Sequence, residues 1–161
     1  MPDQPVVGVS WYEAVAFCLW LSSTTGESIM LPTDPQWQYA AQGDDGRAYP
    51  WGDAWDCGRC RNSVAPCESD AASIVTAYEG KGDSPFGVVD MAGNVWEWTV
   101  TDYDSNSGDP HAEAKTRILR GGSWDDGKPE IFRCDHRNRF GPNLRSYFNG
   151  FRVCRSGGPA G

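Results

Sequence analysis

Two acidic side chains, Asp90 and Glu97, have a spacing that suits a metal ion. They stand seven residues apart in the stretch D-M-A-G-N-V-W-E, and the glycine-containing turn between them offers backbone carbonyl oxygens. Calcium takes six to eight hard oxygen ligands and commonly combines carboxylates with main-chain carbonyls. The stretch therefore predicts a calcium site. The alternative is structural: Asp90 caps a turn and Glu97 pairs with an arginine.

The six cysteines offer a second candidate centre. Cys57-x-x-Cys60 followed by Cys67 has part of a zinc-binding pattern. Structural zinc usually takes four ligands, and both histidines, His111 and His136, are distant in the sequence. We therefore expect a local disulfide, or free thiols in a reducing compartment, in place of zinc.

Acid–base and nucleophilic catalysis have no distinctive motif here. The 22 acidic residues make chance carboxylate pairs inevitable, and His136 stands alone in a segment expected at the surface. The sequence contains neither a G-x-S-x-G turn nor a phosphate-binding glycine loop. We interpret His136 as a surface residue and not as a general base.

The segment between R-G-G-S-W (120–124) and G-F-R-V (150–153) has an unusual composition. Arginines recur through it, and the residues between them share no chemistry and follow neither a strand nor a helix period. One interpretation is a rigid scaffold that displays a changeable surface, and the other is an ordinary long loop. Trp124 follows two glycines, whose close backbone packing is expected to set its ring into the core.

Two capping boxes mark the elements that must position these groups. Ser10 with Glu13 opens a helix expected to end near residue 26, and Thr33 with Gln36 opens a shorter helix expected to end near residue 43. Strands are expected at 95–100, 117–119, 133–134 and 150–154. Frequent Gly, Pro, Asp and Asn predict loops elsewhere, and the tail at 156–161 is expected to fray.

The bulk composition narrows the function classes. The 161 residues suffice for one domain with a real core, and eight Trp, six Tyr and six Phe argue against disorder. A net charge of −8 disfavours nucleic acid, because phosphate binding needs a basic face. The sequence has no apolar run of membrane-spanning length and no secretory signal, so a cytoplasmic location is expected over the cell surface.

A series of motifs, in order, resembles one known family. They are P-V-V-G-V-S-W-Y-E-A (5–14), L-P-T-D-P-Q-W-Q-Y-A-A (31–41), Y-P-W-G (49–52), D-M-A-G-N-V-W-E-W-T (90–99), and R-G-G-S-W with G-F-R-V. Over residues 5–155 the chain resembles the formylglycine-generating-enzyme-like, or sulfatase-modifying-factor, family. The resemblance implies an α+β, C-type-lectin-like fold with two short helices, small antiparallel sheets and much irregular loop. Family members usually carry strands before the first motif, so residues 1–161 are expected to be one ligand-binding domain, the C-terminal module of a longer protein.

The resemblance argues against the family's oxidase activity. Its catalytic enzymes bind copper through two cysteines shortly after R-G-G-S, where this chain has Asp126 and Ile131. Cu(I) prefers soft thiolates, and Cys134 has no partner at the required spacing. We therefore expect no copper and no catalysis.

The resemblance also assigns a structural calcium ion to the acidic stretch. Its ligands would be Asp90, Gly93, Val95 and Glu97, the middle two through their carbonyls. A second calcium site of the family would start near Asn62, but its later carboxylate position holds Thr76, so that site is not expected.

One branch of the family, the variable proteins of diversity-generating retroelements, fits the C-terminal segment better than the enzymes. These proteins end in R-G-G-S-W, a mutable segment with interspersed arginines, and G-F-R-V. Their mutable codons become NNY, which excludes Lys and Glu, so Lys128 and Glu130 are expected to be framework. The expected variable, ligand-binding positions are Asp125, Asp126, Gly127, Ile131, His136, Phe140, Leu144, Ser146, Tyr147 and Phe148. The expected scaffold residues are Trp124, Arg133, Arg137, Arg139 and Arg145.

The function that follows is non-catalytic display. Aromatic residues supply contact area at low entropic cost, and small polar residues add adaptable hydrogen bonds. The arginines would hold the segment through their rigid forks of donors. We expect a protein or other macromolecular ligand, no nucleic acid and no membrane span. The alternatives are a metal-dependent oxidase of the formylglycine-generating type, which predicts affinity for Cu(I), and an ordinary sugar-binding lectin.

Overall fold

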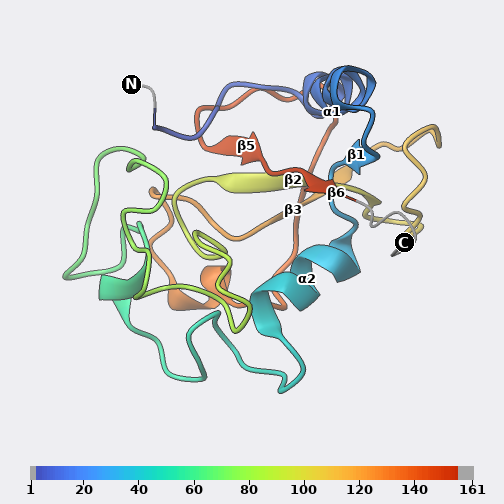
Figure 1. Cartoon of the computed structure of the whole chain (residues 1–161). Helices are drawn as coiled ribbons and strands as arrows, with labels where there is room; N and C mark the ends of the chain where they lie inside the picture. The colour runs from blue at the N-terminus through green and yellow to red at the C-terminus, as the bar shows by residue number, and fades with distance from the viewer. Residues whose placement is uncertain (1–2, 156–161) are drawn as a thin grey trace.

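The computed structural model describes residues 3–155 and contains a central sheet with a helix on either side (Figure 1). The two helices, the small sheets and the long stretches of loop confirm the expected α+β fold. The tail at 156–161, which was expected to fray, lies outside the described residues.

The first helix, α1 (Trp11–Thr25), begins at the predicted capping box. The Ser10 hydroxyl accepts a hydrogen bond from the Glu13 backbone N–H, and the Glu13 carboxylate accepts one from the Ser10 N–H. A glycine in the left-handed region ends the helix, as predicted. Trp11 and Cys18 anchor α1 in the core, where both are almost fully buried.

The second helix, α2 (Asp34–Gln42), also begins at its predicted capping box. The Thr33 hydroxyl accepts from the Gln36 N–H, and the Gln36 side chain accepts from the Thr33 N–H. Trp37 is buried on the side that faces the sheet. This helix start also places the Asp34 carboxylate inside the protein, where it becomes part of the site described below.

The central sheet is built around β2, which is buried along its whole length. Its strands are β2 (Trp96–Asp102), β3 (Arg117–Arg120), β4 (Asn138–Phe140) and β5 (Asn149–Phe151), in the order β4-β3-β2-β5. The β2–β3 and β3–β4 pairs are antiparallel, but β5 is parallel to β2, which corrects the expectation of purely antiparallel sheets. Residues 121–148 therefore leave β3 on one side of β2 and return to its other side.

A second sheet pairs β1 (Ile29–Met30) with β6 (Cys154–Arg155), so the strand expected at 150–154 is divided between two sheets. The strand expected at 133–134 is wrong. A 3-10 helix, Pro129–Phe132, precedes it, and Cys134 is buried with its N–H bonded to a loop carbonyl. Its own carbonyl binds Arg120, so the backbone groups that a strand would pair are used elsewhere.

The long connection between α2 and β2 is mostly loop, and a disulfide between Cys57 and Cys67 closes part of it. This is the local disulfide that was expected in place of zinc. Cys60 is buried nearby, and burial raises the pKa of its thiol to about 12. Within residues 3–155, no cluster of three His, Cys, Asp or Glu side chains could hold a metal. No helix in the same range is long and apolar enough to span a bilayer.

Candidate ligand-binding site

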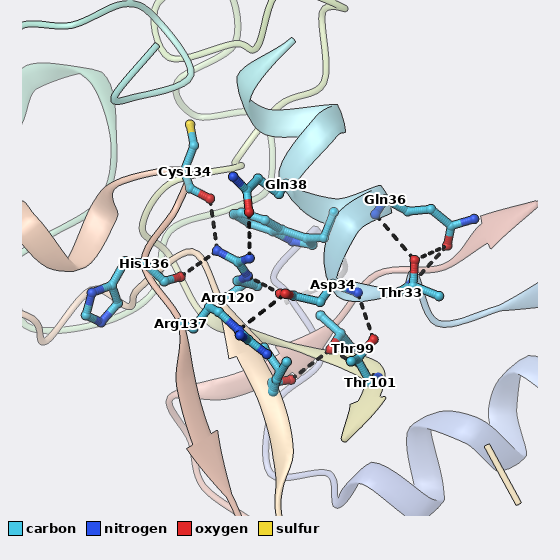
Figure 2. A network of polar contacts seen from close by, with 12 residues as sticks. Thr33, Asp34, Gln36, Gln38, Thr99, Thr101, Arg120, Cys134, His136 and Arg137 are labelled. Atoms are coloured by element: carbon cyan, nitrogen blue, oxygen red, sulfur yellow. Dashed lines mark hydrogen bonds and ion pairs between the residues drawn. The ribbon is translucent and has the colours of Figure 1, made fainter. Parts of the chain in front are cut away.

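Arg120 fastens the C-terminal segment to the rest of the protein. Its side chain is fully buried at the end of β3. Its guanidinium donates to the Asp34 carboxylate, to Gln38 Oε1 at 3.0 Å, and to the carbonyls of Cys134 and His136 at 2.9 and 2.8 Å, as Figure 2 shows. Sequence reasoning missed this role. The available signal was that Arg120 is the arginine of the R-G-G-S-W motif.

Two predicted scaffold arginines also reach outside their own segment. Arg137 lies 3.3 Å from Asp34 and donates to the Asn106 side chain at 2.7 Å. The Arg139 guanidinium lies 4.4 Å from the centre of the Tyr103 ring, and Arg137 approaches the same ring from 5.1 Å. Both arginines therefore tie the middle of the segment to the turn that follows β2.

The other two predicted scaffold arginines differ from each other. Arg145 binds both carboxylate oxygens of Glu13 at 2.9 Å, which joins the segment to the first turn of α1. Arg145 and the capping Ser10 lower the pKa of Glu13 to about 2. Arg133 instead pairs with Asp135, two residues away, at a half-exposed position. The expectation that Arg133 holds the segment to the scaffold is therefore wrong.

Six of the ten predicted variable positions surround one cavity of about 250 Å³. These six are Asp125, Asp126, Phe140, Leu144, Ser146 and Phe148. The rest of the lining, which was not predicted, comprises Trp96, Ser123, Asn138 and Asn149. The cavity thus combines predicted variable side chains with residues of the sheet and of the R-G-G-S-W motif.

The four remaining variable positions do not line this cavity. Tyr147 is 64% exposed, and its ring centre lies 4.2 Å from that of Phe148. Gly127 is exposed. Ile131 is half-buried and packs against the core.

The large apolar side chains of the segment are less uniformly exposed than expected. The Phe140 side chain is 41% exposed, and Tyr147 is also exposed. Leu144 and Phe148, in contrast, are half-buried and pack on the main core. Trp124 is also wrong as a core residue, because it is half-buried with its ring centre 5.3 Å from Phe148. The space beside Gly122 is filled by the Phe132 ring, 2.7 Å from where a Cβ would stand.

His136 is half-buried, with its ring centre 6.0 Å from that of Trp96. Burial and the neighbouring Arg120 lower its pKa below the ordinary value of 6.5. The imidazole is therefore neutral at physiological pH and does not contribute a positive charge near the cavity.

The residues at the family's copper positions do not form a soft-metal site. Asp126 accepts hydrogen bonds from the Ser123 N–H and hydroxyl, and Ile131 offers only an aliphatic side chain. Cys134 is 1% exposed, and burial raises the pKa of its thiol to about 12. This thiol stays protonated and lies outside the cavity lining.

The predicted calcium ligands are near one another but already have partners. Both oxygens of Glu97 accept hydrogen bonds from Arg152 at 2.6 Å, and Oε2 also accepts from Trp37 Nε1 at 2.6 Å. Glu97 therefore pairs with an arginine, as the alternative interpretation proposed. Asp90 accepts a hydrogen bond from the Thr76 N–H at 3.2 Å, and burial raises its pKa.

All four predicted calcium ligands nevertheless line a second cavity, of about 220 Å³, together with Arg152. Their carboxylates and carbonyls are the hard oxygens that calcium prefers. Glu97 Oε1 has one hydrogen-bond donor and therefore a lone pair left for a metal ion. The donor set fits calcium in kind, on the condition that the ion shares Glu97 with the guanidinium.

Two curated proteins illustrate the relatives whose sequences are similar to this chain. The inactive Cα-formylglycine-generating enzyme 2 of Bos taurus is 35% identical over 131 residues, which cover 76% of this chain and 39% of the bovine protein. The formylglycine-generating enzyme of Streptomyces coelicolor is 35% identical over 173 residues, which cover 94% of this chain and 52% of that protein. The chain thus spans about half or less of the length of these relatives.

Two solved structures have the same fold. PvdO from Pseudomonas aeruginosa superposes with a TM-score of 0.81 at 24% identity, over 96% of this chain and 63% of that chain. Treponema denticola variable protein 1 superposes with a TM-score of 0.79 at 24% identity, over 96% and 72%. The family described as "Sulfatase-modifying factor enzyme 1-like domain" matches residues 1–157. The chain therefore belongs to the sulfatase-modifying factor enzyme 1-like family.

Proposed function

We propose that this domain is a non-catalytic display module, the variable protein of a diversity-generating retroelement, which binds a macromolecular ligand through its C-terminal segment. The observation that carries the proposal is the convergence of six predicted variable positions on one cavity, with Tyr147 exposed beside it. Arg120 binds the backbone carbonyls of Cys134 and His136, so this part of the segment is held by contacts that do not depend on the variable side chains.

Two similarities are compatible with this proposal. One relative with 35% identity is named as an inactive enzyme, so the family includes members without catalysis. Treponema denticola variable protein 1 has the same fold. Another relative is named as an active formylglycine-generating enzyme, so the argument against catalysis in this chain rests on its own residues at 126, 131 and 134.

A pair of libraries tests display directly. The first replaces the ten predicted positions with NNY-encoded residues, and the second replaces ten fully buried core positions, such as Trp98 and Ile118, in the same way. Both are displayed on yeast and challenged with protease, which cleaves unfolded variants. We expect most of the first library to survive and most of the second to be lost. Equal losses would show that the segment is structural and would refute display.

A genomic observation provides an independent test. A variable protein of this kind requires a near-copy of the DNA encoding residues 124–150, with adenines at the proposed positions, close to a reverse-transcriptase gene. A near-copy with its differences confined to the ten positions supports the proposal. Differences spread evenly along the segment contradict it.

We further propose that a structural calcium ion binds beside Asp90 and Glu97. The support is the cavity lined by all four predicted ligands and the burial of the Asp90 carboxylate, whose desolvation a cation would offset. The test by chelation is given in the Discussion.

A further inference from the structure

The cavity of about 250 Å³ that six variable positions line has a charge and polarity that suit a particular kind of ligand. Of its lining side chains, the charged ones are Asp125 and Asp126, and no basic residue lines it. Asp126 is engaged by Ser123 through both a backbone and a hydroxyl donor. Asp125 is exposed, and within residues 3–155 its carboxylate has neither a hydrogen bond nor an ion pair. The cavity therefore presents one free carboxylate at its rim.

The cavity has a mixed lining, in which polar residues are joined by four large apolar or aromatic side chains. These four are Trp96, Phe140, Leu144 and Phe148, and the last two continue into the main core. A long side chain with a methylene stem and a charged head matches such a surface, because the stem can cover apolar groups while the head reaches a polar partner.

A buried and unpaired amide provides an observation independent of the acidic side chains. Asn149 is 2% exposed and lines the cavity, and its Nδ2 has no hydrogen-bond partner among the described residues. A buried donor without a partner is unfavourable by about 1–3 kcal/mol. Asn149 lies outside the predicted variable positions, so every variant of the cavity would retain this donor and its need for an acceptor.

We propose that the cavity binds a basic side chain, lysine or arginine, of a protein ligand. Its cationic head pairs with the Asp125 carboxylate, its stem lies along Leu144 and Phe148, and a carbonyl oxygen of the ligand accepts from Asn149 Nδ2. The size agrees, since about 250 Å³ is below the roughly 300–1,000 Å³ typical of sites for whole small molecules. In this arrangement Asp125, a predicted variable position, selects the charge of the ligand. Asn149, which is not a variable position, supplies the same hydrogen-bond donor to every ligand.

This inference rests on the proposed display function, but it can fail separately. The libraries test whether the ten positions tolerate change. The binding of cationic and uncharged probes to the present sequence tests only the chemistry of this cavity. Survival of the first library without cation binding would keep display and overturn the basic-side-chain assignment.

The test uses N-acetyl-lysine N-methylamide as the probe, with the norleucine and glutamate analogues for comparison. Nitrogen–proton correlation spectra of the whole chain report the side-chain amide of Asn149 directly. We expect the lysine probe to shift this signal, the norleucine probe to bind about tenfold more weakly because it lacks a charge-assisted bond, and the glutamate probe to leave it unchanged.

The Asp125→Asn variant locates the carboxylate that matters. It should weaken the lysine probe about tenfold and leave the norleucine probe unaffected, because only the ionic contact is removed. Glu79→Gln is the matched control, since it removes one exposed carboxylate from the connection between α2 and β2 and should change neither probe. Melting curves check folding, and Asp125→Ser replaces Asp125→Asn if that variant unfolds.

Three results would overturn the assignment. One is equal binding of the lysine and norleucine probes. Another is an Asn149 amide signal that does not move when the lysine probe saturates the protein. The third is an equal effect of Glu79→Gln and Asp125→Asn, which would identify net charge alone as the cause.

Discussion

The guanidinium of Arg120 donates to the carboxylate of Asp34, both inside the protein, so the first residue of the R-G-G-S-W motif is bound to the first turn of α2. The same guanidinium binds two carbonyls of the C-terminal segment. One side chain therefore connects a helix start, a strand end and the segment proposed for display. Loss of this connection should affect the stability of the whole domain.

Arg120→Ala should lower the free energy of unfolding by about 3–5 kcal/mol, because it removes the fully buried partner of Asp34 and leaves that carboxylate with only the partly exposed Arg137. The backbone carbonyls of Cys134 and His136 would also lose their donors. Urea denaturation measures the change. Arg133→Ala is the control, since its exposed pair with Asp135 is worth about 0–1 kcal/mol. Similar losses in both variants would show that Arg120 is not the fastening residue.

The exposed aromatic residues of the segment should tolerate replacement. Tyr147→Ser and Phe140→Ser should each change stability by about 0.5 kcal/mol or less, as is usual for surface positions. Trp98→Ala, at a fully buried position of β2, should cost about 3–5 kcal/mol. Chemical denaturation compares the three variants. Unfolding of the Tyr147 and Phe140 variants, with Trp98→Ala still stable, would assign the segment to the core.

Trp124→Ala provides a finer distinction. The Trp124 ring is half-buried against Tyr147 and Phe148, but its backbone is fixed by hydrogen bonds from Ser63 and Ser69 to its carbonyl. The substitution should therefore cost less than Trp98→Ala and leave the cavity backbone in place. A loss as large as that of Trp98→Ala in the same denaturation series would restore Trp124 to the core.

Chelation tests the calcium ion. If Asp90 contributes a ligand, EDTA should lower the melting temperature. The free energy of unfolding lost with the ion depends on free calcium relative to its dissociation constant and reaches about 2.7 kcal/mol at a hundredfold excess. Asp90→Asn should remove this sensitivity. It is preferable to Glu97→Gln, because Glu97 also holds Arg152 and Trp37. Identical melting curves with and without chelator in the unaltered protein would eliminate calcium.

His136 gives a pH dependence with a defined sign. Its pKa is lowered below 6.5 in the folded protein, so the unfolded state binds more protons as the pH falls through this range. The contribution of His136 to stability should therefore decrease between pH 7.5 and 5. His136→Gln should lose less stability than the unaltered protein over that window, in urea denaturation at several pH values, and His111→Gln is the exposed control. A pH-independent difference would contradict the argument.

The absence of a dithiolate predicts the absence of oxidase chemistry. The protein should neither bind Cu(I) stoichiometrically nor convert the cysteine of a sulfatase-type peptide to formylglycine, because the thiol of Cys134 is buried and protonated. Mass spectrometry of the peptide and a competitive copper-chelator titration measure the two properties. Turnover that disappears in Cys134→Ser would overturn the non-catalytic function.

Local signals in the sequence predicted the helices well. Each capping box lies within four consecutive residues, and the structure reproduces both, including the reciprocal hydrogen bonds of Ser10 with Glu13 and of Thr33 with Gln36. The predicted strands at 95–100 and 117–119 also correspond to β2 and β3. The position of each of these elements is determined by contacts between residues close in the sequence, or by a short apolar stretch that a local pattern reveals.

Contacts between distant residues explain what the sequence could not predict. The two-residue strands β1 and β6 pair Met30 with Cys154, and the sequence predicted neither β1 nor the division of the strand at 150–154 between two sheets. The roles of the arginines depend in the same way on remote partners: Arg133 and Arg120 have the same side chain, but only Arg120 faces Asp34. The sequence predicted six of the residues that line the cavity as variable positions, but it predicted neither the cavity nor the part of Asn149, which depends on the pairing of β5 with β2.

The return of residues 121–148 to the far side of β2 limits how this surface could evolve. The path is held by Arg120 on the carbonyls of Cys134 and His136, by the pairing of β4 with β3, and by the parallel pairing of β5 with β2. A residue inserted between two of these contacts would shift the register of the next strand pairing or hydrogen bond along the chain. A repertoire built on this frame must therefore diversify by exchanging side chains at constant length, unlike antibody-type repertoires, which also use long loops to reach recessed targets.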